Sequence, residues 1–379
     1  MRILTIEEHF MATTSTGVDF GVATAPQIWA VWIGPQRNGN QLHDLIFIEA
    51  RPDLGEMATH LVRPVMEIPA QATDVLCPWT TFDRSEATVI WRAWREGKFL
   101  CALSSGGTLP QRQDLAAPPD AVLRPALMSN KSELDIFVLS GALRQLSLFR
   151  FIPPSPQRLA TQSVLWRFAL PEAAINGRVA MGTAEHGSHR RIVLLAQEAG
   201  RPNRPPQLLV MHADAGDGGS APRGVTVSHI PEAITMPNSE PGVYVDTAGV
   251  THTSILFRRD IENPAFFLAD LAFGPDGKAI GEPLVESLGV LPTPATSAAV
   301  SFLAEPGRPM RRDWVVILQD GSVMHSQIPG RPMKTRGIPV EPPDLVVLRQ
   351  TTYLLTQPQT SRQGMPDAGP KAPLLEPLI

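Results

Sequence analysis

Prolines and glycines interrupt this chain so often that they constrain its fold more than any other feature. The sequence of 379 residues contains 38 prolines and 29 glycines, spread along its whole length. Proline removes a backbone donor and clashes with the preceding helical turn, so few windows remain that can hold a helix of average length. We therefore expect helices to be rare and the fold class to be all-β.

Short apolar runs of strand length lie between these breakers, and each is rich in β-branched or aromatic residues. The clearest examples are DLIFIEA, ATVIWRAW, DIFVLS, RIVLLAQ, QLLVMHA, AFFLADLAF and DWVVILQ. Turn residues separate several of them. Residues 314–319 and 322–327 flank Asp320-Gly321, which predicts a hairpin whose type I′ turn has positive φ angles at both turn residues.

The strand signals recur in groups of four. Each group starts with an apolar run that follows a gap rich in Pro, Gly or Thr, and the starts are about 54 residues apart on average, as in repeat architectures with loop insertions. They fall near Val18, Asp74, Val122, Arg178, Gly242, Ser297 and Asp344. The groups that begin at Arg178 and Gly242 show four strands in succession. The last strand of the second group is weaker and is expected between Ile280 and Leu284.

A repeat of four-stranded sheets resembles the β-propeller superfamily. A lone sheet of this kind exposes apolar surface on both faces, and stacking such sheets around an axis buries it without leaving long open edges. The resemblance is one of architecture only, since the chain has no Gly-His…Trp-Asp pair per blade and no kelch double glycine. It implies a seven-bladed ring, with six blades as the alternative.

The two ends of the chain are predicted to complete the ring together. The residues before the first group start and after the last start add up to about one repeat. We therefore predict a final blade shared between residues 345–348 and 353–356 from the C-terminal end and residues 2–6 from the N-terminal end. Residues 1–356 form the propeller in this prediction, and residues 357–379, with five prolines, form an extended tail.

Charge and composition narrow the classes of partner. The net charge of −4 and the pI near 6.2 provide no overall basic field, so we expect no binding to nucleic acid. No apolar run approaches the roughly 20 residues that span a bilayer, and we expect no membrane association. The two cysteines, Cys77 and Cys101, cannot make a disulfide framework and have no metal-ligand spacing. We accordingly expect a cytoplasmic protein without cofactor or metal.

Three segments contain residues that are common in enzyme sites. Glu7-x-His9 resembles the first strand of metal-dependent amidohydrolase-type decarboxylases, but the (β/α)₈ barrel of that family needs about eight helices, for which this chain has no room. The stretch from Glu185 to His189 and the loop from His212 to Gly219 carry possible ligands without a complete zinc or calcium set. We expect both to be solvated loops, and the catalytic residues, if any, stay unknown.

Arginine pairs are the best candidates for a binding site. The set is Arg190, Arg191, Arg258, Arg259, Arg311 and Arg312. If the blades align, these pairs fall near comparable hairpin ends and form a basic patch on one rim, facing an acidic protein partner. The alternative is that they are solvated hairpin ends which protect edge strands.

These observations favour a non-enzymatic scaffold for protein interactions, or a subunit of a larger hetero-complex, built on a β-propeller. The alternative function is a hydrolase or lyase that acts on a glycan or another small molecule at the central channel.

Overall fold

The fold is described from a computed structural model. It describes residues 4–5, 28–36, 42–50, 61–69, 72–80, 86–93, 98–105, 113–115, 117–118, 121–125, 134–140, 144–152, 161–170, 179–186, 189–198, 205–215, 220–237, 239–259, 264–303, 310–339, 343, 345–348, 351–357 and 374–378. Secondary structure in these ranges consists of β-strands, turns and bends, without a helix. Consequently, no helix in this part of the chain is long and apolar enough to cross a membrane.

The strands form a series of small sheets in chain order. The first sheet contains β1 (Leu4–Thr5), β2 (Ile28–Gln36), β3 (Leu42–Ala50) and β4 (Leu61–Pro69). The second contains β5 (Ala72–Thr80), β6 (Glu86–Ala93), β7 (Lys98–Ser105) and β8 (Gln113–Leu115). The third contains β9 (Val122–Pro125), β10 (Leu134–Ser140), β11 (Gln145–Ile152) and β12 (Thr161–Ala169). The fourth contains β13 (Val179–His186), β14 (His189–Glu198), β15 (Gln207–Ala215) and β16 (Val225–Pro231).

Three further sheets complete the series. The fifth contains β17 (Ile234–Thr235), β19 (Gly242–Val245), β20 (Thr251–Arg258), β21 (Ala265–Phe273) and β22 (Leu284–Val290). The sixth contains β18 (Ser239–Glu240), β23 (Ala295–Leu303), β24 (Arg311–Leu318), β25 (Ser322–His325) and β26 (Met333–Lys334). The seventh contains β27 (Ile338–Pro339), β28 (Leu345–Leu348), β29 (Thr351–Gln357) and β30 (Leu374–Pro377).

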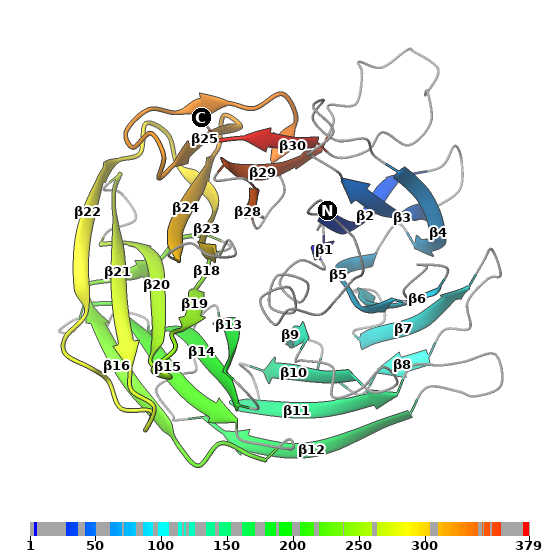
Figure 1. Cartoon of the computed structure of the whole chain (residues 1–379), viewed down its shortest axis with the longest axis horizontal. Helices are drawn as coiled ribbons and strands as arrows, with labels where there is room; N and C mark the ends of the chain where they lie inside the picture. The colour runs from blue at the N-terminus through cyan, green and yellow to red at the C-terminus, as the bar shows by residue number, and fades with distance from the viewer. Residues whose placement is uncertain are drawn as a thin grey trace.

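These sheets are arranged around a common centre, with one strand of each nearest the centre and later strands farther out (Figure 1). Neighbouring inner strands lie side by side, as β13 does with β9 and β19, and β19 with β23. Strands within a sheet pair antiparallel, with β18 as a parallel addition to β23. This is the architecture of a β-propeller.

The core lies between neighbouring sheets and not inside any one of them. Successive residues of a second strand point to different clusters, so both faces of the sheet are buried: Leu194 and Leu195, Leu256 and Phe257, and Val315 and Val316. A strand that is buried on both faces needs a continuous apolar run and not an alternating one. That requirement explains why runs such as RIVLLAQ predicted the second strands well.

Glycines allow the inner strands to approach each other closely. A Cβ atom on Gly182 of β13 would lie 2.6 Å from the carbonyl oxygen of Pro241 and 2.7 Å from a methyl group of Val243. A Cβ atom on Gly242 of β19 would lie 2.8 Å from the carbonyl oxygen of Val300. Real Cβ atoms do not come so close, so a larger residue at either position requires the inner strands to move apart.

The predicted repeat corresponds closely to the observed sheets over most of the chain. Inner strands begin at Ala72, Val122, Val179, Gly242, Ala295 and Leu345, within two residues of the predicted starts. The first predicted start, Val18, lies outside the described residues, and the first sheet instead begins with β1. The weak strand expected at 280–284 is observed as β22, which begins at Leu284 and ends at Val290.

The shared final blade is not what the structure shows. Leu4 and Thr5 pair instead with Val31 and Ala30 of β2, which places the N-terminal strand in the first sheet. The last sheet is extended instead by β30, whose residues pair with β29. The segment predicted as an extended tail thus contributes a strand at its end, and its preceding residues 358–373 lie outside the described ranges.

The Asp320-Gly321 hairpin forms at the predicted place but with another turn. Gly321 has a φ of 78°, whereas Asp320 is not among the residues with positive φ. The Gly321 N–H donates to the Leu318 carbonyl at 2.9 Å, and Asp320 Oδ1 accepts from the Ser322 N–H at 3.0 Å. The loop therefore has three residues and ends in a left-handed glycine, which corrects the predicted type I′ turn.

Candidate functional site

The six predicted arginines do not lie on one rim. Arg190 and Arg191 begin β14, and Arg311 and Arg312 begin β24, so both pairs follow the turn that leaves an inner strand. Arg258 ends the equivalent strand β20, which places it and Arg259 toward the opposite rim. Equivalent strands run in the same direction around a propeller, so residues at the start and at the end of such strands lie toward opposite rims. A single patch of all six is therefore not formed.

Arg190 and Arg191 are tied into the structure by aspartates. Arg190 Nη1 lies 3.0 Å from Oδ2 of Asp135, which belongs to the neighbouring third sheet and also accepts from Arg150 Nε at 3.0 Å. Asp135 is buried, and the Arg190 side chain is only 13% exposed. Arg191 forms an ion pair with Asp214 on β15. The Arg190–Asp135 ion pair therefore links the third and fourth sheets, and the Arg191–Asp214 ion pair links two strands of the fourth sheet.

Arg311 and Arg312 make similar connections around the sixth sheet. Arg311 Nη2 lies 2.8 Å from Asp313 Oδ2 and also contacts Thr352 of the seventh sheet. Arg312 pairs with Asp270 of the fifth sheet, and its Nη2 lies 3.6 Å from Glu286 Oε2. Buried Asp313 in addition accepts from Ser326 Oγ at 3.0 Å and from Gln327 Nε2 at 2.7 Å. These arginines span the seams between sheets, a role that their sequence spacing did not reveal.

Arg259 is the most exposed of the arginines with a described ion pair. Its side chain is 53% exposed, Nη1 lies 3.9 Å from Glu232 Oε2, and its guanidinium carbon lies 5.1 Å from the centre of the Phe267 ring. Such an exposed pair contributes little to stability. Arg259 therefore keeps most of its charge available to a partner, in contrast with Arg190 and Arg191.

Two histidines of the predicted loops lie near these pairs. His189 Nδ1 lies 3.3 Å from Asp214 Oδ1. His212 is buried in β15, stacks on Phe273 with ring centres 4.7 Å apart, and its Nε2 lies 3.3 Å from Thr251 Oγ1. Burial, and to a lesser extent the charge of Arg191, lower the pKa of His212 from 6.5 to about 4, although Asp214 acts in the opposite direction. His212 is thus a neutral interior group and not part of a solvated loop, which corrects the prediction for this residue.

The other sequence candidates are only partly described. Glu7 and His9 lie outside the described residues, as do the side chains of Glu185 and His186. In the part of the chain that the structure covers, no three His, Cys, Asp or Glu residues gather as a metal site would require. Among the tryptophans, Trp166 and Trp314 are buried, as expected for core residues.

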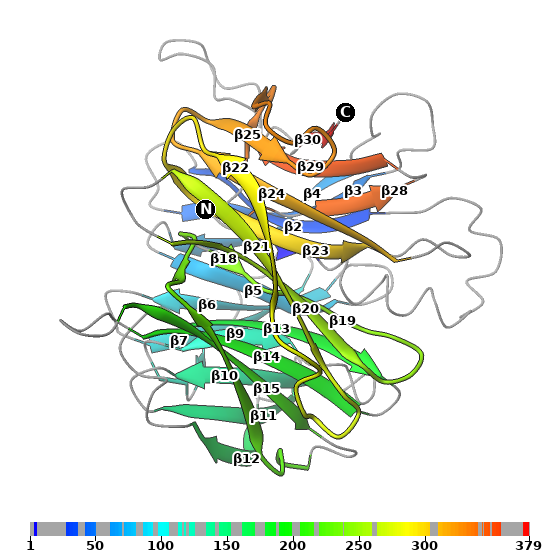
Figure 2. The same cartoon turned by 90° about the vertical axis from the view of Figure 1, so that its left-hand side faces the viewer.

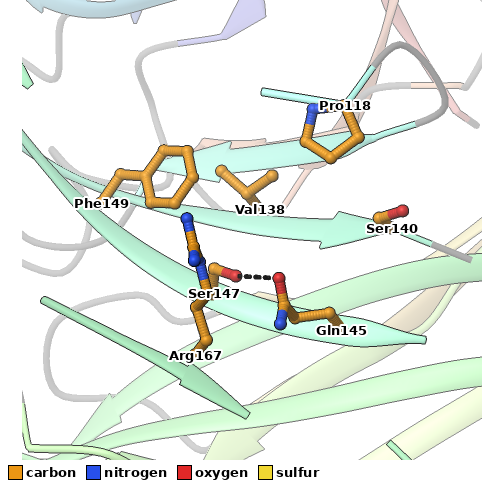
Figure 3. A pocket seen from close by; sticks show the side chains of 7 residues that line it. All are labelled: Pro118, Val138, Ser140, Gln145, Ser147, Phe149 and Arg167. Atoms are coloured by element: carbon orange, nitrogen blue, oxygen red, sulfur yellow. Dashed lines mark hydrogen bonds between the residues drawn. The ribbon is translucent and has the colours of Figure 1, made fainter. Parts of the chain in front are cut away.

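A pocket of about 320 Å³ opens on the face of the third sheet away from the fourth (Figure 3). Its walls come from three strands and from the segment after β8: Pro118, Val138, Ser140, Gln145, Ser147, Phe149 and Arg167. Ser147 Oγ donates to Gln145 Oε1 at 3.4 Å. Sequence reasoning did not find this site, although its signal is the serine and glutamine that interrupt the apolar run QLSLFRF on one face of β11.

An exposed apolar edge lies on the fifth sheet. β22 is the outermost strand of this sheet; it lies at the outer edge in Figure 1 and toward the viewer in Figure 2. We use the term β22 edge for four exposed side chains: Ile280 (52%), Leu284 (74%), Val285 (43%) and Val290 (61%). Among the described residues, Val164 and Ile328 are also large, apolar and exposed, and neither belongs to the β22 edge.

Comparisons with known proteins find structural similarity only at low sequence identity. No protein-family model matches the sequence, and no curated protein matches it. Among solved structures, the extracellular domains 1–2 of Drosophila semaphorin 1a have 8% identity and a TM-score of 0.43, over 86% of this chain and 83% of that one. The β-propeller domain of the trilobed protease from Pyrococcus furiosus has 10% identity and a TM-score of 0.38, over 88% of both chains. The WD40 domain of SCAP from fission yeast has 7% identity and a TM-score of 0.42, over 85% of this chain and 76% of that one.

Proposed function

We propose that this chain is a seven-bladed propeller that serves as a scaffold for protein interactions, or as a subunit of a larger complex, and that a partner docks on the β22 edge. The series of seven sheets in chain order supports the blade count. The observation that carries the function is the group of exposed apolar side chains at the β22 edge, because large apolar side chains gathered on one surface usually mark an interaction site.

The form of the β22 edge favours a partner that adds a strand. On its inner side β22 pairs with β21, and within the described ranges no strand pairs with its outer side. An open edge of this kind offers backbone donors and acceptors to an extended segment, and the side chains beside it select the sequence. The exposed carboxylates of Glu282 and Glu286 lie along the same edge, so the expected segment combines apolar residues with a basic one.

One face of β22 is left uncovered because the neighbouring sheet is short at its outer side. Leu288 packs against the cluster shared by the fifth and sixth sheets, and Leu284 lies on the same face of β22. The register shift after Ser287 places Val290 on the opposite face, with Val285. The outer strands of the sixth sheet, β25 and β26, have only four and two residues. A docked segment would cover the exposed side chains of β22, as a full-length outer strand of the neighbouring sheet would.

The arginine pairs are a secondary element of this proposal. An acidic partner surface would contact the exposed Arg259 rather than Arg190 and Arg191, whose charges are taken up by Asp135 and Asp214. The alternative function, a hydrolase or lyase at the central channel, has less support. The aspartates described near the arginine-bearing turns, including Asp270 and Asp313, are held by ion pairs and not presented to a substrate.

Site-specific photo-crosslinking in the native cell tests the proposal. A benzoylphenylalanine at Val285 should give one predominant crosslinked protein, and Leu284→Lys combined with Val290→Lys in the same chain should abolish it. The matched control is benzoylphenylalanine at Ser163, an exposed position on the outer strand β12 of the third sheet. The same products at both positions, or a product that survives the lysine substitutions, would contradict docking at the β22 edge.

A further inference from the structure

The pocket on the third sheet has polar side chains in its lining, in contrast with the apolar cluster on the opposite face of the same sheet. On β11 the residues that point toward the fourth sheet, Leu146 and Leu148, belong to a buried apolar cluster. The residues that alternate with them, Gln145, Ser147 and Phe149, line the pocket on the opposite face. An apolar seam would suffice for packing, so polar side chains in this place need another explanation.

Strand register brings the polar groups of the pocket into two adjacent rows. Val138 on β10 lies opposite Ser147 on β11, and Ser147 lies opposite Arg167 on β12. Ser140 is opposite Gln145 in the next row. Both serines are buried, with 2% and 4% exposure. Figure 3 shows Arg167 and Ser147 side by side at the pocket, with Phe149 and Val138 on one side and Gln145 on the other.

Arg167 is the charged group of this pocket. No ion pair or hydrogen bond to its guanidinium is found within the described ranges, whereas Arg150, on the neighbouring strand, is paired with Asp135. The residue is exposed, which keeps it solvated while the pocket is empty. A guanidinium forms its strongest contacts with a planar carboxylate, which accepts two parallel hydrogen bonds.

From this arrangement we infer that the pocket binds a carboxylate carried on a small apolar body. The carboxylate pairs with Arg167, Ser147 and Gln145 supply neutral hydrogen bonds, and Val138, Phe149 and Pro118 contact the apolar part. A volume of about 320 Å³ is at the small end of the range for ligand pockets, which limits the ligand to a small acid or to the terminal residue of a chain. The free acid and the chain terminus present the same chemistry to the pocket.

Ligand-observed NMR titrations of the full chain test this inference with four probes. Hexanoate and hexanamide differ only in charge and represent the free acid. N-acetyl-alanyl-leucine and its C-terminal amide represent a chain terminus. One charge-assisted contact corresponds to about a 10- to 100-fold change in affinity, so each acid should bind at least tenfold more tightly than its amide.

The matched variants are Arg167→Gln and Arg223→Gln, which remove the same charge from exposed positions, one in the pocket and one after β15. Arg167→Gln should weaken binding of the acids at least tenfold, Arg167→Lys should restore part of it, and Arg223→Gln should leave it unchanged. Tighter binding of the dipeptide acid than of hexanoate would identify a chain terminus as the natural ligand, and the reverse order a free acid. Equal affinity of acid and amide, equal loss in both glutamine variants, or no binding at millimolar concentrations would overturn the inference.

Discussion

His212 illustrates how tertiary contacts change the chemistry of a single residue. In the sequence it opens a polar, glycine-rich stretch, yet it lies inside β15 with its ring against Phe273. Its charged form is disfavoured by burial and by the nearby Arg191, and Asp214 only partly offsets this. The folded protein therefore keeps this imidazole neutral where an unfolded chain would protonate it.

A pH dependence of stability follows from this. The folded pKa is lowered, so at pH values between about 4 and 6.5 the unfolded state binds more protons, and the free energy of unfolding falls as the pH falls. The His212 contribution is complete above pH 6.5 and decreases by about 3 kcal/mol toward pH 4. Urea unfolding at a series of pH values, compared between the native chain and His212→Gln, should show a smaller slope for the variant. Parallel curves would contradict the assignment; His325, whose pKa burial also lowers, contributes equally to both proteins.

At the scale of elements, the arginine pairs act as connectors between sheets. Arg190 reaches Asp135 on the third sheet, Arg312 reaches Asp270 on the fifth, and Arg311 reaches Thr352 on the seventh. From the sequence, paired arginines at the start of a strand suggest a surface patch. The sequence does not show which aspartate of a neighbouring sheet lies opposite each arginine. The apolar runs of the strands were easier to interpret, since burial on both faces leaves a direct mark in composition.

A double-mutant cycle on Arg190 and Asp135 measures this connection. Arg190→Gln and Asp135→Asn should show a coupling energy of about 1 to 3 kcal/mol in the free energy of unfolding, because the aspartate is buried and the charges are in contact across two sheets. The pair formed by Lys278 and Asp276, at 83% and 59% side-chain exposure, serves as control and should show almost none. Similar coupling in both pairs would mean that Arg190 is only a surface charge.

At the scale of the whole molecule, the C-terminal strand completes the last sheet. Buried Glu376 on β30 accepts hydrogen bonds from the backbone N–H groups of Arg336 at 2.7 Å and Gly337 at 2.6 Å, and from Thr356 Oγ1 at 2.8 Å. Leu378 packs into the cluster between the sixth and seventh sheets. These contacts hold the end of the chain in place, a role that was predicted for the N-terminal residues.

Glu376→Gln should lower the free energy of unfolding by about 1 to 3 kcal/mol, because the amide replaces an acceptor by a donor facing a backbone N–H. Deletion of residues 374–379 should lower the melting temperature further. The exposed Glu282→Gln is the control and should leave the temperature unchanged. Scanning calorimetry measures both the free energy of unfolding and the melting temperature of each variant. Unaltered melting after the deletion would show that β30 adds nothing to the stability of the seventh sheet.

The sequence by itself determined the all-β class, the propeller architecture and most group starts, because breakers, continuous apolar runs and their spacing are local features. Only the tertiary structure decided which strand closes the last sheet, which rim each arginine occupies and where the pocket around Arg167 lies. These depend on pairs of residues that are far apart in the chain, such as Glu376 with Gly337 or Arg190 with Asp135. These residues stabilise the protein only after loops of unequal length have brought their sheets together. The pattern of strands along the sequence therefore does not show which distant residues form contacts.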